Sequence, residues 1–409
     1  MSNTNLTIDM ITKEALRVAH EKLAFLGTID RSYDDRYAKG GAKIGSALRV
    51  REPNRFTRRS GSRVMNVQDV TSTYKTLTLA TQDGVDMRFN SSELSLDIDE
   101  FSKQYIQPAM ASLVSGIEGD VLSAVTKKVW NQTGAAGTVV GSSSGDISAI
   151  FNARAVLNRN LAPMEGRCLQ LDSVTMAAIV NGNKALFNPQ SDNAKAFKEG
   201  YFGRAAGSSW YENERTYVHT VGADVTAATA ANATITDGGG SSDYCTITWD
   251  ASNTIAAGDV FTLPKVYMCH PETKANTGQL MQFVAKAAST GTTTDIYPRI
   301  YWSGPKQNVC SATGTASVTG DFDSETATFT GTAATAYRQN LMYAPEAFTF
   351  VTADLPIMKG GECSRQVYDG LSMRVWSDGD IRNDELLTRI DILYGYEALK
   401  PEWAVRITN

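Results

Sequence analysis

The stretch ALRVREPNRFTRRSGSRVMNVQDVTSTYKTLTL, residues 47–79, is the most informative part of this 409-residue sequence. Apolar and polar residues alternate at both of its ends, over 47–51 and 74–79, which predicts two strands. The arginine-rich stretch from Arg49 to Arg63 is basic and has Glu52 as its single acid. A two-stranded hairpin is at best marginally stable by itself, so we expect this one to lie on another molecule. Its arginines are Arg49, Arg51, Arg55, Arg58, Arg59 and Arg63.

Three interpretations of these arginines stay open. They could form a solvated strand surface, pair with acids on a neighbouring subunit, or contact nucleic acid. The guanidinium fork suits a carboxylate or a phosphate equally well. We favour pairing with a neighbouring subunit.

A second pattern precedes this stretch and predicts an amphipathic helix that ends near Gly27, because apolar residues recur at spacings of three and four. The apolar stripe must be buried on its own domain or on a neighbouring subunit. The stripe consists of Ile8, Ile11, Ala15, Ala19, Leu23 and Leu26. The polar residues Asp9, Glu14, Arg17 and Glu21 fall mostly on other faces and are candidates for an assembly surface.

The longest helical pattern covers residues 97–132. Asp97 and Asp99 suit a helix N-terminus because they complement the helix dipole. Pro108 predicts a kink or a break near the first turns, because proline lacks the N–H that a helix interior needs. Such a helix would be roughly 50 Å long.

Beyond residue 146 the pattern becomes α/β. We expect Asp146 to cap a helix that ends before Pro163, and Ser173 to cap a second helix. Strands are predicted at 168–171 and from Trp210 to Thr220. The α/β pattern resumes near the C-terminus, with strands at 347–351, 371–376, 387–396 and 403–407.

Residues 221–336 differ in composition, being rich in Thr, Ala, Gly and Ser and poor in Lys and Arg. Short alternating strands with glycine-rich turns predict a small barrel or sandwich. We therefore predict a β domain inserted into an α/β host, with host segments from both sides of the insert pairing in one sheet.

Composition excludes several classes of protein. Apolar residues make up 42% and charged residues 20%, which is typical of a globular protein with two or three domains. The net charge of −5 argues against a chain whose main task is to grip nucleic acid. We expect the five widely spaced cysteines to be free thiols. No signal peptide or membrane-spanning run is expected.

No catalytic or metal site is predicted. Residues 141–145 match the G-x-S-x-G motif of hydrolases around Ser143, but the strong strand that the motif needs is missing, so we interpret them as a linker. His270 and Glu272 lack the cysteine pair of a zinc deaminase. Asp321, Asp323 and Glu325 are interpreted as a solvated acidic turn rather than a Ca²⁺ site.

Several blocks of the sequence resemble the phage P22-type major capsid proteins. The similarity is carried by MITKEALRVAHEKLAFLGTIDRSYDDRYAKGG and the residues after it (10–61), and by TLATQDGVDMRFNSSELSLDIDEFSKQYIQPAM (78–110). It continues in YFGRAAGSSWYENERTYVHTVG (201–222) and GDIRNDELLTRIDILYGYEALKPEWAVRI (379–407). In the insert, GDVFTL and TGQLMQFVAKA also fit.

The resemblance implies an α+β chain with the HK97-type capsid fold and an inserted small β-barrel domain. The implied parts are an N-terminal arm (1–43), an extended E-loop (44–96), a peripheral domain with a spine helix (97–145), an axial domain (146–220 and 337–409) and the insert (221–336). It implies no catalytic residues and no cofactor.

The resemblance also implies a virion protein that assembles in the host cytoplasm. Such proteins form pentamers and hexamers, often on a T=7 lattice, with a scaffolding protein, a portal protein and packaged dsDNA as partners. Net acidity fits an inner wall along which DNA slides without specific contacts. A decoration protein on the insert stays open. The rival interpretations are a β-rich adhesion or carbohydrate-binding module and a serine hydrolase.

Overall fold

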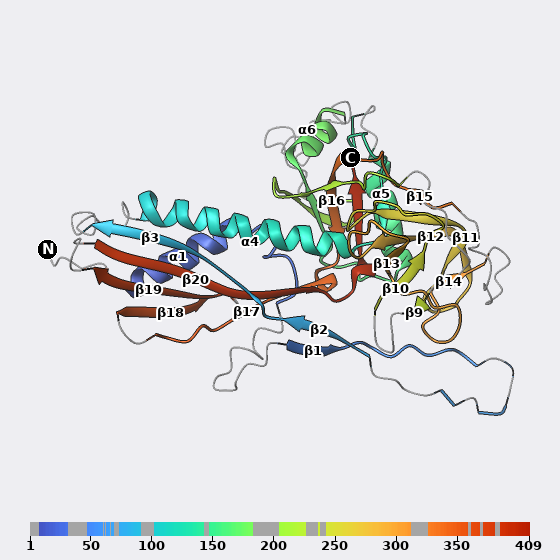
Figure 1. Ribbon diagram of the computed structural model, residues 1–409, viewed down its shortest axis with the longest axis horizontal. Coiled ribbons are helices and arrows are strands. Elements are labelled where there is room, and N and C mark those ends of the chain that lie inside the picture. Colours follow the sequence, from blue (N-terminus) through green and yellow to red (C-terminus); the bar gives the residue numbers. More distant parts are fainter. Residues whose placement is uncertain are drawn as a thin grey trace. The chain divides into compact units, whose positions relative to one another are not determined.

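The computed structural model describes residues 8–31, 47–59, 61, 63–65, 67–68, 73–90, 102–142, 147–182, 204–225, 236–237, 243–311, 326–358, 361–368, 371–380 and 385–409. The chain divides into two compact units, each built from three separate segments (Figure 1). Unit 1 comprises Met1–Val50, Thr76–Val121 and Phe348–Leu399. Unit 2 comprises Arg51–Lys75, Leu122–Ala347 and Lys400–Asn409. None of the described helices is long and apolar enough to cross a membrane.

Unit 1 is built on a five-stranded antiparallel sheet, here called the peripheral sheet. Its strands are β17 (Phe348–Ala353), β20 (Glu385–Ala398), β19 (Leu371–Asp380), β18 (Glu362–Tyr368) and β3 (Thr81–Asn90). The long strand β20 pairs with β19 along one edge and with both β3 and β17 along the other. Thr388, Ile390, Ile392 and Tyr394 alternate on one buried face of β20, which includes the strand predicted over 387–396.

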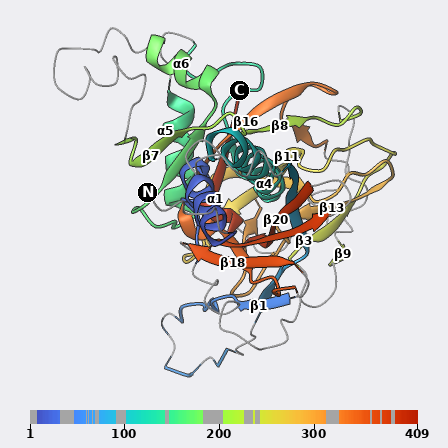
Figure 2. The same cartoon turned by 90° about the vertical axis from the view of Figure 1, so that its left-hand side faces the viewer.

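Two helices lie on one side of the peripheral sheet (Figures 1 and 2). Helix α1 (Ile8–Lys22) packs on β18 and β19 and buries Ile11, Ala15 and Ala19 there, so its stripe is covered by its own unit. Helix α4 (Gln107–Lys128) follows a π-helical turn, η2 (Ser102–Ile106). The helical conformation changes from π to α at Gln107, next to Pro108, and is continuous through this point, so the predicted kink or break stays a prediction. Residues 91–101, including Asp97 and Asp99, lie outside the described part.

The first sheet of unit 2, here called the central sheet, runs in the order β4 (Gln132–Thr133), β21 (Ala404–Thr408), β16 (Ala336–Tyr343), β5 (Cys168–Leu171), β7 (Ser208–Glu212) and β6 (Arg204–Ala205). Strand β8 (Tyr217–Thr220) also pairs with β16. Thus β16, which follows the insert, pairs with β5 and β8, which precede it. The predicted pairing of host segments across the insert is confirmed.

Helices α5 (Ser148–Arg159) and α6 (Ser173–Gly182) belong to unit 2 as well, and Ile150, Leu157, Met176 and Ile179 pack into the core of the central sheet. The N-cap of α5 is Ile147, which makes no side-chain cap bond, while Asp146 lies outside the described residues. The single strand predicted over Trp210–Thr220 is observed as two strands, β7 and β8, because they pair with different neighbours.

The insert forms the second sheet of unit 2, in the order β14 (Val309–Cys310), β11 (Val260–Cys269), β12 (Asn276–Ala285), β13 (Thr293–Tyr297), β10 (Cys245–Thr248) and β9 (Thr236–Asp237), with β15 (Thr328–Phe329) beside β11. Trp249, Phe261 and Phe283 fill its core. The rings of Trp249 and Phe261 pack edge to face, with their centroids 5.6 Å apart. The described strands make a curled half-barrel. This sheet agrees with the inserted β domain predicted for the region, and the small barrel stays a prediction.

The short strands β1 (Ala47–Arg51) and β2 (Tyr74–Thr78) pair in a separate two-stranded sheet. Two 3-10 turns, η4 (Pro345–Ala347) and η5 (Pro401–Trp403), are the remaining elements of the described residues. The chain between β1 and β2, residues 52–73, is called the arginine loop below. Over its described residues, the long hairpin predicted here has regular strands only at its base.

Candidate interaction site at the arginine loop

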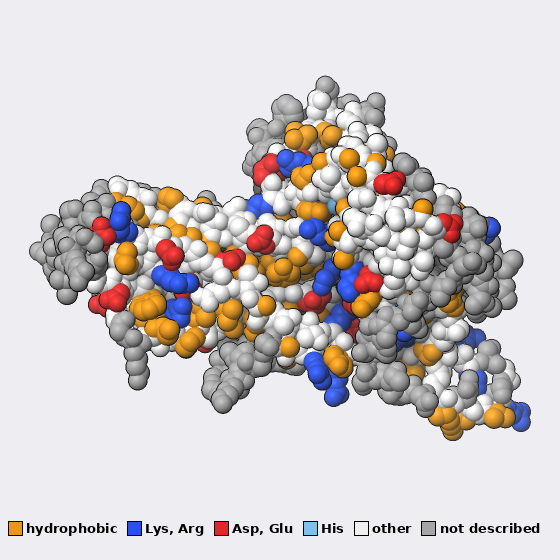
Figure 3. Space-filling view, viewed as in Figure 1, with side chains coloured by type: hydrophobic (Ala, Val, Ile, Leu, Met, Phe, Trp, Pro, Cys, Tyr) orange, Lys and Arg blue, Asp and Glu red, His pale blue; other side chains and the backbone are white. Residues whose placement is uncertain are grey.

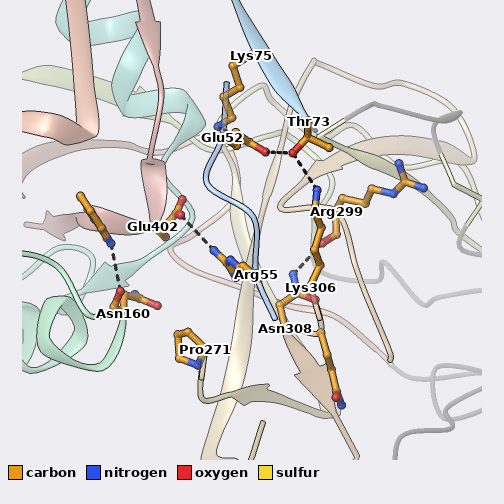
Figure 4. A network of polar contacts seen from close by, with 12 residues as sticks. Glu52, Arg55, Thr73, Lys75, Asn160, Pro271, Arg299, Lys306, Asn308 and Glu402 are labelled. Atoms are coloured by element: carbon orange, nitrogen blue, oxygen red, sulfur yellow. Dashed lines mark hydrogen bonds and ion pairs between the residues drawn. The ribbon is translucent and has the colours of Figure 1, made fainter. Parts of the chain in front are cut away.

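The arginine loop starts and ends at a polar network within unit 2 (Figure 4). Glu52 N–H donates to the Thr73 carbonyl at 2.9 Å, and the Thr73 hydroxyl donates to the Glu52 carboxylate at 2.9 Å. The Thr73 hydroxyl also accepts from Lys306 Nζ of the insert at 3.1 Å. Lys75 Nζ lies 4.0 Å from the Glu52 carboxylate. The two ends of the loop are therefore tied to each other and to the insert.

Farther out, side chains replace the regular strand ladder. The Gln68 amide donates to the Thr57 carbonyl at 2.7 Å and accepts from the Thr57 N–H at 2.8 Å. Near the tip, the Arg59 guanidinium donates to the Val64 carbonyl. Paired amide bonds of this kind, at ordinary hydrogen-bond distances, hold an irregular ribbon in a fixed register without requiring strand conformation. The described part of the loop thus has a defined shape, although its regular strands are limited to the base.

The tip of the loop exposes apolar side chains to an unusual degree. Phe56 is 60% exposed, Val64 77%, Met65 78% and Val67 76%. Figure 3 shows hydrophobic side chains next to basic ones at the end of the loop. An apolar cluster rimmed by polar groups is typical of a protein–protein contact.

The predicted arginines have different environments. Arg55 is drawn back to its own chain, where its guanidinium lies 3.6 Å from the Glu402 carboxylate of η5. Arg58 and Arg63 are exposed and pair with no acid among the described residues. Arg49 and Arg51 point to the exposed face of β1. The structure therefore brings Arg55 together with an acid of the same chain and leaves the outer arginines at the surface.

The base of the loop also gathers lysines that the sequence did not single out. Lys274 Nζ donates to the carbonyls of Pro271 and Gln307, at 2.7 and 3.1 Å. Burial lowers the pKa of Lys274, and the nearby charge of Arg55 lowers it further. Burial likewise lowers the pKa of Lys306; Glu52 opposes this effect, and Arg55 and Arg299 add to it. Positive charge is therefore concentrated here.

The second candidate surface is on helix α1. Arg17 and Glu14 pair on its outer side, with Arg17 Nη2 2.6 Å from Glu14 Oε1. Asp9 accepts a hydrogen bond from the Ser364 hydroxyl of β18. The side chain of Glu21 lies outside the described residues. The turn after α1 is held by the buried carboxylate of Glu118 on α4, which accepts from Phe25 N–H at 2.5 Å and from Ala24 N–H at 3.5 Å.

A buried polar cluster joins the insert to the rest of unit 2. His219 Nε2 of β8 lies 2.7 Å from the Asp259 carboxylate, which also accepts from the N–H groups of Gly222 and Ala256. Arg406 of β21 is fully enclosed and donates to the Gly258 carbonyl at 2.8 Å. Burial lowers the pKa of Arg406 to about 9. No sequence motif indicated this cluster, because its members are far apart in the chain.

Other predicted features carry no chemistry in the described residues. Ser143 lies outside the described part, as do Asp321, Asp323 and Glu325. His270 Nδ1 accepts the N–H groups of Glu272 and Thr273, which makes it a turn cap. All five cysteines are free, as predicted. No group of three or more metal-binding side chains gathers within the described ranges.

Comparison with known proteins identifies the family. The model of the family described as "P22 coat protein - gene protein 5" matches residues 64–408, which is most of the chain. No curated protein matches. The chain is similar in structure to one from Mycobacterium phage Che8, at 10% identity and a TM-score of 0.49, with 94% of this chain and 90% of that chain covered. It is also similar to the capsid of cyanophage P-SCSP1u, at 10% identity and a TM-score of 0.44, covering 94% and 89%.

A third similar structure is the virus-like particle from Pyrococcus furiosus, at 9% identity and a TM-score of 0.40, with 98% of each chain covered. The family match alone decides the assignment, since it spans both units and the arginine loop from Val64 onward. The chain therefore belongs to the P22 coat protein family, whose members have the HK97-type capsid fold; it is a major capsid protein of a tailed phage, a component of the icosahedral virion shell, and not an enzyme.

Proposed function

We propose that copies of this chain join into pentamers and hexamers through the arginine loop. The observation that carries this proposal is the exposure of Phe56, Val64, Met65 and Val67 at the tip of a loop whose shape is fixed by its own hydrogen bonds. An adjacent copy that covers this tip would remove apolar area from water at about 25 cal/mol per Å². Repeated under symmetry, such contacts close a shell.

The arginines divide into two roles in this proposal. Arg49, Arg51, Arg58 and Arg63 contact acids of adjacent copies. Arg55 and Arg59 first shape the loop, through Glu402 and the Val64 carbonyl. Charges at the rim of a contact set register and association rate more than affinity. The apolar tip supplies binding energy, and the arginines set where the tip docks.

The outer side of α1 is proposed as a second assembly surface, formed by Asp9, Glu14, Arg17 and Glu21. Arg17 is 51% exposed in its side chain, and its partner Glu14 is a surface acid. A surface ion pair of this type contributes at most about 1 kcal/mol, so both residues can change partners at little cost. This is the property that an assembly surface with successive partners needs.

The finer assignments follow the family. We propose an N-terminal arm (1–43), an E-loop (44–96), a peripheral domain with the spine helix (97–145), an axial domain (146–220 and 337–409) and an inserted β-barrel domain (221–336). A scaffolding protein guides assembly on a T=7 lattice, and dsDNA enters through a portal protein. Packaged DNA is contacted without sequence specificity, and a decoration protein on the insert is an additional partner.

The decisive experiment reverses one tip charge, with the variant Arg58→Glu. We expect the purified variant to fold with the melting temperature of the wild type, because Arg58 is exposed and pairs with no acid in the described chain. The yield of closed shells, counted by electron microscopy and sedimentation, should fall at least about ten-fold, because the weakened contact is repeated at every copy of the shell.

The matched control is Lys265→Glu, which reverses an exposed charge in the insert and should leave shell yield unchanged. A second variant, Met65→Ser, tests the apolar tip and should also reduce shell formation. Wild-type yields of closed shells from both Arg58→Glu and Met65→Ser would exclude the arginine loop as the assembly contact.

A further inference from the structure

Three cationic side chains converge at the base of the arginine loop, and their hydrogen-bonding capacity is only partly used. An ammonium group has three donors and a guanidinium has five. Lys274 uses two donors on backbone carbonyls, and Lys306 uses one on the Thr73 hydroxyl. Arg55 makes a single loose ion pair, at 3.6 Å from Glu402. Several N–H groups at this site therefore remain available to a ligand.

Neither lysine makes a direct ion pair among the described residues, although the Glu52 carboxylate is near enough to Lys306 to oppose the lowering of its pKa. Within the described residues, neither Lys274 Nζ nor Lys306 Nζ has a carboxylate within 4.0 Å, and the oxygens that they contact are neutral. Both lysines are half-buried. A half-buried cation without a carboxylate partner is costly, because burial removes water from the charge. Nearby anionic charge would remove this cost.

Repulsion among the positive charges of Arg55, Lys274 and Lys306 also favours the binding of an anion at this site. Arg55 is close enough to lower the pKa of both Lys274 and Lys306, so the three positive charges repel one another across a short distance. Figure 4 shows Arg55 and Lys306 side by side between Glu402 and Thr73, with Arg299 beyond them. The opposing carboxylates in this network are Glu52 and Glu402, which leaves the network with excess positive charge.

We infer that Arg55, Lys274 and Lys306 form a binding site for an oxyanion, occupied in the shell by the carboxylate of an acidic side chain from a second copy of the chain. A charge-assisted bond from guanidinium or ammonium to a carboxylate is roughly twice as strong as a neutral hydrogen bond. The second copy is the chosen source because the chain carries 44 acidic against 39 basic residues. Copies packed in a shell bring those acids within reach.

The site rests on the proposed assembly through the arginine loop, and it refines that assembly in one respect. Arg55 and Thr73 belong to the loop, whereas Lys274 and Lys306 belong to the insert. An acid bound between them would fix the loop against the insert. Docking of one copy would in this way set the angle at which the loop of the next copy leaves unit 2.

The test measures the reactivity of each lysine toward an acetylating reagent, read by mass spectrometry. Only the neutral amine reacts, and a bound anion raises the lysine pKa; a rise of about one unit lowers the neutral fraction about ten-fold. Free subunits are compared in inorganic phosphate and in sodium chloride of equal ionic strength. We expect phosphate to slow the acetylation of Lys274 and Lys306, while exposed Lys13 serves as the internal reference.

Two variants make this arm specific. Arg55→Gln should abolish the phosphate protection of both lysines, whereas Arg51→Gln, an exposed arginine on the adjoining strand, should keep it. Protection that is equal for Lys13, Lys274 and Lys306 would overturn the site, as would protection that survives Arg55→Gln.

The second arm compares free subunits with assembled shells in the absence of phosphate. Slower acetylation of Lys274 and Lys306 in shells, restored by high salt, supports a carboxylate from a second copy. Unchanged reactivity of Lys274 and Lys306 in shells would show that no carboxylate from a second copy occupies the site, which would then be a site for a free oxyanion. Because the first arm uses free subunits, a failure of the loop as an assembly contact is distinguished from a failure of the anion site.

Discussion

Asp391 of β20 faces Gly84 of β3, and a methyl group on Gly84 would lie 2.6 Å from the Asp391 carboxylate oxygen Oδ1. The space that glycine leaves is filled by this carboxylate, which is fully buried. It accepts from Arg374 Nη2 at 2.6 Å and from Arg389 Nε at 2.7 Å. Gly84 thus allows a buried ion pair to form inside the peripheral sheet.

Gly84→Ala should therefore destabilise unit 1. The added methyl group also meets the Ile390 carbonyl at 2.6 Å, so backbone and carboxylate would both have to move. We expect a loss of about 1–3 kcal/mol in the free energy of unfolding, measured by urea denaturation. The control is Gly379→Ala on β19, where a methyl group would meet nothing within 4 Å. Equal stability of the two variants would contradict the prediction.

Asp259→Asn should weaken the connection between the insert and the central sheet. The substitution removes the charge that faces His219 at 2.7 Å in a site where both side chains are buried. Losing a buried hydrogen bond to a charged group costs about 1.5–3 kcal/mol. The matched control within the insert is Asp295→Asn, whose surface contact with Lys286 spans 3.7 Å. Its expected cost is below about 1 kcal/mol. The melting temperatures of the two variants test this prediction, and an equal decrease in both would contradict it.

Glu118→Gln should loosen helix α1. The buried carboxylate accepts the N–H groups of Phe25 and Ala24, and an amide offers one acceptor oxygen where the carboxylate offers two. We expect hydrogen exchange in residues 8–28 to accelerate by about ten-fold, equivalent to about 1.4 kcal/mol, while exchange in the insert is unaffected. Glu14→Gln, at the surface pair with Arg17, should leave exchange in α1 within about two-fold.

The buried thiols should resist alkylation in the folded chain. Burial raises the pKa of Cys269 to about 12, with Cys310 as a further cause, so almost no thiolate is present near neutral pH. With iodoacetamide, Cys363 should react first because it is only partly buried. Urea should make all five thiols reactive.

Since the folded pKa of Cys269 is raised, its contribution to stability is complete below about pH 9 and declines as the pH rises toward 12.

Mass spectrometry of the alkylated chain checks this order. Rapid modification of Cys269 in native protein at neutral pH, at the rate seen for Cys363, would show that the insert opens locally there. The comparison needs no substitution, because the more exposed thiol of the same chain is its reference.

Local patterns in the sequence predicted most of the elements. The alternation in β20 and the spacing in α1 are both properties of neighbouring residues, set by backbone periods of 2.0 and 3.6. The change in composition at both ends of the insert was also readable. It led to the correct expectation that β16 pairs with strands on the far side of the insert. Strand β18 was missed, because its pattern of small and polar residues has no clear period.

The candidate site was only partly predictable. The run of arginines marked the loop, since clustered charge is visible in any window of sequence. The ion pair between Arg55 and Glu402 could not be predicted from the sequence, because the two residues lie near opposite ends of the chain and neither belongs to a local motif. Lys274 and Lys306 were overlooked for the same reason. The exposure of Met65 and Val67 also depends on what the rest of the chain leaves uncovered.

The sequence by itself determined the local elements, the host-and-insert division and the basic character of the loop, because each depends on residues close together in the chain. Tertiary structure alone decided which charges are buried. Asp259, Arg406, Glu118 and Asp391 look like ordinary surface residues in the sequence. A charge can be enclosed only where the chain path supplies its partners, and here those partners come largely from segments that are distant in the sequence.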